Sequence, residues 1–598
     1  MFRSNVGGKH LMRLYTAFKR DGFEIEKIVK YKGKRGILAK SRSILNYDTG
    51  KPKSAYYLEG SPYEMGYLMG SLAEREIALM MDYTDRVVFS FIGSKVLEKI
   101  KLIQRTLISL VYELSKPAVQ KLPEEMREEI RGIYDGCKNI NPKTSVNIEH
   151  LTVLNIGIDI ICSMVYSGDF FKKDTKGIEP EDFRVPMMCN ALTVCGKSAG
   201  DGYYFGRDFT FPSSDVFQDT AAPIIYNPED SVSYKGRRAI PFVNIAAPGM
   251  IGSIAAMNLE GVALGVNMSP GANCTPGNVG INSLLMARMC AQYGSSAETA
   301  ADLMAELPKG VSWLYIIADG KTGRSCAAEA GAPIAEENLA ADISQGTGAA
   351  QSSDTYQRLD FTKSEIFSRG PDFTQYPWEE YRPMLPDLGY IREHATVPYH
   401  NGVMFRWNDY RYPSEYLAFN RRLWTYHNEK NKTDKAIHPD AFDEKGYINK
   451  TGEENCPSSF YFAPQREEND DILVVTNHYI IPEMRYFAMN RWTQRIVGKR
   501  VNDIQWRYDE LNNLIHDKLR SKGSIGFEDA RELISFLSPS GRNKDYHADN
   551  PRSRDGKQLR IEGCISVFDL KKKVVESHYG YFCDKWVRIT LPEYFDKN

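Results

Sequence analysis

The chain has 598 residues, which is enough for more than one hydrophobic core, although a large sandwich domain can occupy this length alone. Its 76 basic and 77 acidic residues give a formal net charge of −1, and this balance argues against a nucleic-acid-binding protein. No run approaches the roughly 20 apolar residues of a membrane-spanning helix, and the start of the chain has no signal-peptide core. We therefore expect a cytoplasmic protein with no transmembrane segment and no nucleic-acid partner.

The N-terminal arm is more basic than the rest of the chain. Residues 1–42 carry twelve Lys or Arg residues against three acidic residues. We interpret this arm as solvated and partly mobile. A weak attraction to an anionic membrane surface is the alternative.

From about residue 61 to residue 166 the hydrophobic pattern is helical. Ser61 suits the N-cap of a first helix, and Pro62 suits its first position, where a missing N–H costs nothing. Pro123 repeats this arrangement before a second helix, and Gly136 is expected to end that helix. Residues 1–188 are therefore predicted to be mostly helical.

Residues 168–188 are charged, contain Pro and Gly and lack periodicity, so they are predicted to form an exposed linker. From Cys189 onwards the pattern changes to short apolar or alternating runs separated by turn residues, which indicates strands. The run AAMNLEGVALGVN, residues 255–267, predicts a hairpin. Two helices are expected to follow, at 281–293 and 297–306.

Residues 340–470 form a polar, aromatic and loop-rich insertion. A long irregular insertion of this kind is either a functional lid or disordered, and its aromatic residues favour an ordered cap. Strands are predicted again at 471–480, 564–570 and 574–582, with a helical stretch around 488–537.

The ten cysteines and ten histidines are scattered along the chain. They include no CxxC pair, no HExxH motif and no other spacing typical of metal ligands. Several cysteines lie inside apolar runs, which suits reduced, buried thiols better than a disulfide framework. The sequence therefore implies no metal and no organic cofactor.

Cys189 stands at the first position of a predicted strand, directly after the linker. If the chain is cut before this residue, its new α-amine has a pKa of about 7.7–8.0 and can take the proton of its own thiol. Before cleavage, the same sulfur can attack the Met188 carbonyl and form a thioester that water resolves. A cysteine in this position therefore suits an N-terminal nucleophile, although a buried structural thiol is the simpler interpretation.

Five motifs occur in order along the chain: EGSPYEMGYLMG (59–70), the cysteine followed by GRDF (206–209), the hairpin, YIIADGKTGRSCAAEAG (315–331) and TNH (476–478). This set resembles the autoproteolytic N-terminal nucleophile (Ntn) hydrolases related to isopenicillin N acyltransferase (acyl-CoA:6-aminopenicillanic acid acyltransferase), and more distantly the choloylglycine hydrolases. The resemblance implies an α+β fold, a four-layer αββα sandwich with two stacked antiparallel sheets. It also implies that a precursor splits into chain 1–188 and a catalytic chain 189–598, which stay associated.

The resemblance implies a role for each matching residue. Cys189 is the nucleophile and, through its α-amine, the base. Asn267 helps to hold the oxyanion, and Asn477 binds near the nucleophile. Arg207 lies beside the cysteine, where its charge favours the thiolate. The implied reaction is attack on the linear amide of an N-acylated small molecule through a thioester, completed by water or by an amine.

The sequence departs from the family pattern after Gly206. Relatives have an Asp four positions after this Gly, and it contacts the new α-amine, whereas Thr210 stands there in this chain. Because alternate residues of a strand share a face, we expect Asp208 to replace it. Cys195, six residues after the proposed nucleophile, is the rival thiol. It has no linker before it, so we interpret it as a core residue.

Three further residues have two interpretations each. Arg491 and Arg495 are either surface charges of a helix or candidates for substrate binding, as in the choloylglycine branch. His478 is either a structural hydrogen-bonding residue or the base of a Cys–His pair that acts without self-cleavage. A non-catalytic, unprocessed small-molecule-binding protein on the same fold is the alternative function. The expected partners are the amide substrate and the cleaved N-terminal chain. Further copies of the protein, in a homo-oligomer, are the third expected partner.

Overall fold

The computed structural model describes residues 3–45, 50–92, 101–161, 188–200, 202–212, 216–268, 280–310, 313–330, 399–400, 402–411, 469–477, 479–481, 501–536, 561–579 and 585–595. The linker before Met188 and most of the insertion 340–470 lie outside these ranges. The described residues form a mixed α+β fold with two large sheets and a small two-stranded sheet.

Within the described ranges the larger sheet has eleven strands, in the order β1-β2-β3-β6-β9-β10-β11-β12-β13-β15-β14. They are β1 (Phe23–Tyr31), β2 (Lys34–Leu45), β3 (Pro52–Gly60), β6 (Ala222–Pro228), β9 (Phe242–Ala246), β10 (Ala255–Asn258), β11 (Val262–Met268), β12 (Trp313–Asp319), β13 (Ser325–Ala330), β14 (Tyr399–His400) and β15 (Val403–Trp407). The smaller sheet has the order β16-β4-β5-β17-β18-β19. Its strands are β4 (Met188–Val194), β5 (Tyr204–Pro212), β16 (Ile472–Val475), β17 (Ile561–Asp569), β18 (Val574–Tyr579) and β19 (Val587–Thr590). The two-stranded sheet pairs β7 (Ser233–Tyr234) with β8 (Arg237–Arg238).

The described helices are α1 (Arg3–Arg20), α2 (Pro62–Ile92), α3 (Lys101–Lys121), α4 (Glu124–Ile140), α5 (Ile148–Thr152), α7 (Val216–Thr220), α8 (Ser283–Tyr293), α9 (Ala297–Glu306), α17 (Val501–Lys522) and α18 (Phe527–Phe536). A π-helical turn, Val153–Gly157, continues α5, and short 3-10 turns lie at Gly196–Ala199 and at η10, Leu591–Tyr594. The expected hairpin is β10–β11, and the two helices expected after it are α8 and α9. None of the described helices has the length and the hydropathy that crossing a membrane requires.

Within the described ranges the two large sheets are antiparallel except at one place. Strand β3 pairs with β6 in parallel, from Tyr56 opposite Ile224 to Gly60 opposite Pro228. The expectation of purely antiparallel sheets is wrong here. The two strands are separated by about 160 residues of chain, so no hairpin fixes their relative direction.

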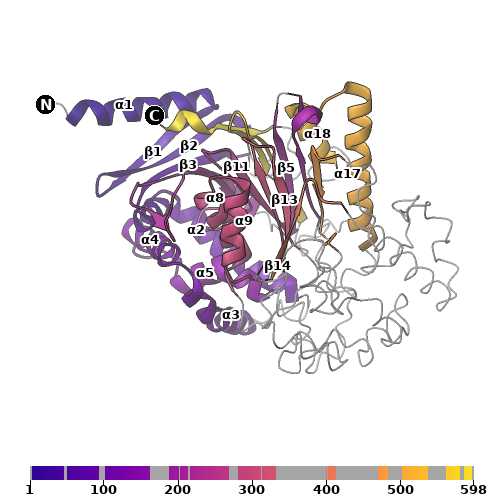
Figure 1. The fold of residues 1–598 in the computed structure, drawn as a ribbon. Coiled ribbons are helices and arrows are strands. Elements are labelled where there is room, and N and C mark those ends of the chain that lie inside the picture. The colour runs from indigo at the N-terminus through magenta and orange to yellow at the C-terminus, as the bar shows by residue number, and fades with distance from the viewer. Residues whose placement is uncertain are drawn as a thin grey trace, which may run out of the picture.

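The two faces of the smaller sheet contact different parts of the molecule. One face packs with α17 and α18 through a hydrophobic cluster that includes Leu192, Leu511 and Ile534. The other face lies toward the larger sheet, because β11 contacts both β4 and β5. Helices α2, α8 and α9 cover the far side of the larger sheet, as Figure 1 shows.

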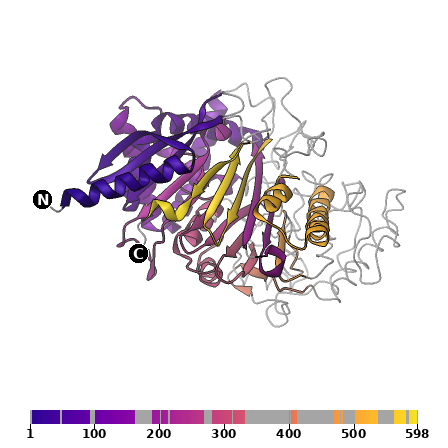
Figure 2. The same cartoon turned by 90° about the horizontal axis from the view of Figure 1, so that it is seen from above.

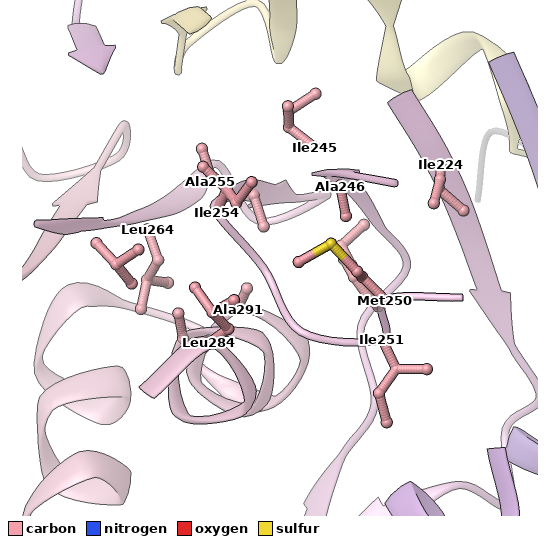
Figure 3. Close-up of a cluster of buried hydrophobic side chains, with 14 of the residues drawn as sticks. Ile224, Ile245, Ala246, Met250, Ile251, Ile254, Ala255, Leu264, Leu284 and Ala291 are labelled. Atoms are coloured by element: carbon pink, nitrogen blue, oxygen red, sulfur yellow. The ribbon is translucent and has the colours of Figure 1, made fainter. Parts of the chain in front are cut away.

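The core between the larger sheet and α8 is built from small and branched side chains (Figure 3). Ala255, the first residue of β10, its neighbour Ile254 and Leu264 of β11 lie opposite α8, where the facing side chains are Leu284 and Ala291. All five are buried. At Gly252 an added Cβ would lie 2.6 Å from the Cβ of Leu284, so the chain approaches α8 closely at a residue without a side chain.

The N-terminal arm is folded, so its interpretation as a solvated, mobile segment is wrong for residues 3–45. Helix α1 buries Leu14 and Phe18, and the ring of Phe18 lies edge-on to Tyr594 of η10, with 4.9 Å between the ring centres. Asp21 accepts hydrogen bonds from the main-chain N–H of Thr590 (2.7 Å) and from the Tyr594 hydroxyl (3.0 Å). Figure 2 shows the yellow turn η10 beside α1.

Helices α2 and α4 pack through glycines. The pairs Gly66 and Gly70 on α2 and Gly132 and Gly136 on α4 are each spaced four residues apart, which places both members of a pair on one face of the helix. An added Cβ at any of these four positions would lie 2.1–2.2 Å from a main-chain oxygen of the other helix. Gly136 therefore serves helix packing, and its prediction as a helix stop is wrong, because α4 continues to Ile140.

Candidate active site

Cys189 lies near the start of β4, whose first residue is Met188. It pairs with Phe209 of β5, and its neighbour Asn190 pairs with Asp208. The Cys189 side chain is 1 % exposed and belongs to the hydrophobic cluster between the sheets, whereas Leu192 points toward α17 and α18. The thiol therefore faces the larger sheet, as the alternation of β4 requires.

Arg207 points to the same side of the smaller sheet as Cys189, because it is two residues from Phe209 on β5. Gly265 of β11 makes room for it, since an added Cβ there would lie 2.8 Å from the Arg207 Cδ and 3.1 Å from its Nε. Burial lowers the pKa of the Arg207 guanidinium, and the nearby Cys189 and Asp208 side chains oppose this shift. The expected neighbourhood of Arg207 and Cys189 is thus present in the structure.

The Arg207 guanidinium keeps part of its hydrogen-bonding capacity unused. Its Nη1 donates to the main-chain oxygen of Asp208. Its Nε and Nη2 are buried and have no hydrogen-bond partner among the described residues. Burying such donors is costly unless a substrate, an anion or water satisfies them. They mark the space beside the Cys189 thiol as a place where negative charge is stabilised.

Asn477 follows β16 and holds the main chain of Cys189. Its Oδ1 accepts the Cys189 N–H at 2.9 Å, and its Nδ2 donates to the Met268 carbonyl at 2.7 Å. Asn267 is next to Met268 on β11, and its Nδ2 donates to the carbonyls of Val475 (3.2 Å) and Thr476 (2.8 Å). The two asparagines therefore join β11 of one sheet to the end of β16 in the other.

The amide groups of these asparagines restrict what they can do in the uncut chain. Both Nδ2 groups donate to main-chain carbonyls, so neither is directed at an oxyanion. The Asn267 Oδ1 is buried without a partner among the described residues, and it can accept a hydrogen bond but not donate one. The oxyanion role expected for Asn267 would require its side chain to turn.

Arg507, on α17, is a residue of this site that the sequence analysis missed. Its Nη1 donates to the Cys189 carbonyl (3.0 Å) and to the Asn190 Oδ1 (2.6 Å), and its Nη2 donates to the Asn477 Oδ1 (3.0 Å). The side chain is fully buried. Arg507 lies four residues before Leu511 and eight before Ile515, on the same face of the helix as these buried apolar residues. An arginine in an apolar stripe indicates a buried charge with a specific partner, and this pattern could have identified Arg507 from the sequence.

Asp208 lies on the opposite face of the smaller sheet from the Cys189 thiol. Its Oδ2 accepts a hydrogen bond from Asn190 (3.2 Å), and its Oδ1 accepts one from the Thr210 hydroxyl (3.3 Å). Residues 190, 208 and 210 thus share the face that α17 covers, where Arg507 contacts Asn190. The contact expected between Asp208 and the new α-amine stays a prediction.

The other candidates divide into two groups. Cys195 lies just after β4, and its thiol contacts the Asp471 carbonyl at 3.5 Å. Burial and the nearby charges of Asp471 and Asp470 raise the pKa of Cys195 to about 12, which disfavours a nucleophilic thiolate. Arg491, Arg495 and His478 lie outside the described residues.

Glu329 and Arg406 hold the segment that carries Asn477. Glu329, on β13, accepts hydrogen bonds from the main-chain N–H groups of Ile480 (2.9 Å) and Ile481 (3.0 Å). Arg406 donates to the Glu329 Oε1 (3.2 Å) and to the Val474 carbonyl (3.1 Å). The segment is therefore fixed on both sides of Asn477.

This arrangement predicts a pH dependence. Burial raises the pKa of Glu329 to about 7, although Arg406 and the two N–H groups lower it in part. Because the folded-state pKa lies above the unfolded value, the stability from this group is complete below about pH 4.5 and is lost as the pH rises through 7. We expect the free energy of unfolding of the wild type to fall by up to about 3 kcal/mol relative to Glu329→Gln between pH 5 and pH 8. Denaturant unfolding of both proteins across this range measures the difference, and parallel curves would contradict the assignment.

The similarities of this chain to known proteins are distant. No protein-family model matches the chain. An uncharacterized protein of Archaeoglobus fulgidus is 28% identical over 574 residues, which are 95% of this chain and 69% of that protein. Two variants of the conjugated bile acid hydrolase of Clostridium perfringens are 10% and 9% identical, with TM-scores of 0.30 and 0.28. Each match covers 68% of this chain and 93% of the hydrolase. Because TM-scores this low do not establish a common fold, the functional assignment depends on the geometry of the site.

Proposed function

We propose that the protein is a self-cleaving cysteine hydrolase or acyltransferase that acts on a linear amide of an N-acylated small molecule. One observation carries this proposal: the buried Cys189 thiol lies beside the unsatisfied donors of Arg207, and Asn477 holds the nitrogen of the same cysteine. That nitrogen is the atom that becomes the α-amine on cleavage. The pattern suits a residue that is both nucleophile and base.

Self-cleavage requires only groups of the chain and water. The Cys189 sulfur attacks the Met188 carbonyl carbon, and the bond from this carbon to the Cys189 nitrogen breaks as that nitrogen takes up a proton. The product is a thioester between Met188 and the Cys189 sulfur. Water hydrolyses it to a Met188 carboxylate and a thiol. Asn477 and Arg507 fix the N–H and the carbonyl of Cys189, so they orient the bond that is cut.

The mature site would use the same atoms on a substrate. The α-amine of Cys189, with a pKa of about 7.7–8.0, takes the thiol proton, and the sulfur attacks the amide carbonyl. Arg207 stabilises the thiolate and the charge that develops nearby, because its Nε and Nη2 have no hydrogen-bond partner among the described residues. The amine leaves with a proton, and water or a second amine releases the acyl group. Asp208, Asn267 and the candidates Arg491 and Arg495 complete the proposed site.

The fold supports a stable two-chain product, which we propose as a four-layer αββα sandwich. Cleavage before Cys189 leaves β1–β3, α1 and α2 on the N-terminal chain, while β6 and the C-terminal strands belong to the other chain. Strand β3 stays paired with β6, and Asp21 stays bonded to Thr590. The two chains therefore share one sheet and one core, and we expect them to form a heterodimer.

The test is the denatured mass of freshly purified wild-type protein. We expect two fragments that meet between Met188 and Cys189. His478→Ala separates this mechanism from a Cys–His pair, because its cleavage should match that of the wild type. A wild-type chain that stays uncut after long incubation would contradict self-cleavage and leave a non-catalytic binding protein as the function.

A further inference from the structure

The start of α1 and the tip of the β1–β2 hairpin form one end of the structure, which the proposed chemistry does not use. A turn of two residues joins α1 to β1, and the two elements contact each other, so β1 runs back along α1. Lys30 of β1 pairs with Arg35 of β2. Arg35 donates its N–H to Glu59 (2.9 Å), which contacts His10 of α1 (3.3 Å). The hairpin tip therefore lies beside the first half of α1, and Figure 1 shows both at the same side of the molecule.

Three lysines at this end are exposed: Lys9 on α1, Lys30 on β1 and Lys32 in the hairpin turn. Within the described ranges none of them pairs with a carboxylate. The Lys32 ammonium lies 5.4 Å from the centre of the Tyr31 ring, and this contact leaves its charge uncompensated. The three lysines therefore present their positive charges to solvent.

The acidic side chains of this segment do not neutralise these lysines. The three acidic residues of 1–42 all lie between Asp21 and Glu26, around the start of β1. A strand rises about 3.3 Å per residue, so Lys30 is about 13 Å along β1 from Glu26. Exposed charges farther apart than the Debye length of about 8 Å are largely screened from each other. Glu59, which lies closer, is paired with Arg35 (3.7 Å).

The outward face of α1 adds apolar groups to this end. Met12 is 65 % exposed and Tyr15 is 44 % exposed, whereas Leu14 and Phe18 on the inward face are buried. Met12 is three residues from Lys9, so the two side chains are neighbours on the helix surface. Helix α1 contains no acidic residue. Exposed methionine and tyrosine side chains beside lysines are typical of helices that lie on a membrane surface.

We propose that this basic end, formed by Lys9, Lys30, Lys32, Met12 and Tyr15, binds the surface of a membrane that contains anionic lipids. The lysines pair with the lipid head groups, and each contributes about fivefold to the affinity. Met12 reaches the boundary of the acyl chains, and the Tyr15 hydroxyl stays at the level of the head groups. A nucleic acid offers negative charge but no hydrocarbon for Met12, so the apolar groups favour a membrane. The basic end belongs to the uncut chain, and the inference does not depend on self-cleavage or on amide chemistry.

The test is sedimentation of the full chain with lipid vesicles, either of phosphatidylcholine alone or with about 30 % phosphatidylglycerol added. We expect the wild type to bind the anionic vesicles and not the neutral ones, and to be released by high salt, which screens the charges. Replacing Lys9, Lys30 and Lys32 together by glutamine should weaken binding at least about twentyfold. Met12→Gln should weaken it by about threefold.

A second triple variant, with Lys143, Lys197 and Lys571 replaced by glutamine, is the matched control. These lysines are also exposed but belong to other elements, and their loss changes the net charge by the same amount. We expect this variant to bind the anionic vesicles as the wild type does. Both triple variants should show the same chain cleavage as the wild type, which separates membrane binding from the proposed function.

Three results would contradict the inference. The first is a wild-type protein that does not bind anionic vesicles or binds neutral ones equally well. The second is an equal loss of binding in the two triple variants, which would mean that only the net charge matters. The third is tighter binding to double-stranded DNA than to anionic vesicles, which would make a nucleic acid the partner of the basic end.

Discussion

Cys189→Ala is expected to give a single uncut chain without amide hydrolysis, where the wild type gives two chains. The substitution removes the sulfur that attacks the Met188 carbonyl, and no other group of residue 189 can replace it. We expect cleavage and turnover to fall at least about 10³-fold, as when a nucleophile is removed from other covalent enzymes. Denatured mass and circular dichroism together distinguish a folded, uncut variant from an unfolded one.

Cys195→Ala is the matched control for this prediction. Both thiols are buried, but Cys195 lies near Asp470 and Asp471, which raise its pKa, whereas Cys189 lies beside Arg207. Its loss should leave cleavage at the wild-type rate. If Cys195→Ala stayed uncut while Cys189→Ala was processed, the assignment of the nucleophile would be reversed.

The position of part of the candidate site could be anticipated from the sequence. The family resemblance pointed to Arg207 and Asn477, and the structure places Arg207 on the same face of the smaller sheet as the Cys189 side chain and Asn477 at the Cys189 N–H. Their roles in catalysis stay predictions. Strand alternation could not decide whether the Asp208 side chain lies on the same face of the sheet as the Cys189 thiol. It correctly placed residues 208 and 210 on one face, but it does not say which face points toward the thiol.

Features of the fold and the site that depend on partners remote in sequence could not be predicted from the residue pattern. Arg507 is 318 residues from Cys189, and only the folded chain brings its guanidinium to the Cys189 carbonyl. Helix α1 and strands β1 and β2 were taken for a solvated arm because residues 1–42 are rich in lysine and arginine, and the partners that bury this segment are remote in sequence. Gly136 looked like a helix stop because its real partner, the Tyr67 carbonyl on α2, is remote in sequence.

Gly136→Ala is expected to be among the most destabilising single substitutions outside the site. Its new Cβ would lie 2.2 Å from the Tyr67 carbonyl oxygen and 3.0 Å from the Ser71 nitrogen, and main-chain atoms cannot rotate away. Helices α2 and α4 must move apart to make room for the methyl group. The packing lost along both helices lowers the free energy of unfolding. We expect a loss of about 3 kcal/mol or more, at the upper end for overpacked cores. Urea unfolding of both proteins measures it.

Gly8→Ala and a double variant make this prediction specific. Gly8 lies within α1 and an added Cβ there meets nothing within 4 Å, so its substitution should stabilise the protein by about 0.5–1 kcal/mol through helix propensity alone. Gly70→Ala should cost about as much as Gly136→Ala, because its Cβ would lie 2.2 Å from the Ile133 carbonyl. Once one alanine has separated the helices, the second meets more space, so the double variant should cost clearly less than the sum. Strictly additive losses would mean that the glycines act independently and not through one shared helix contact.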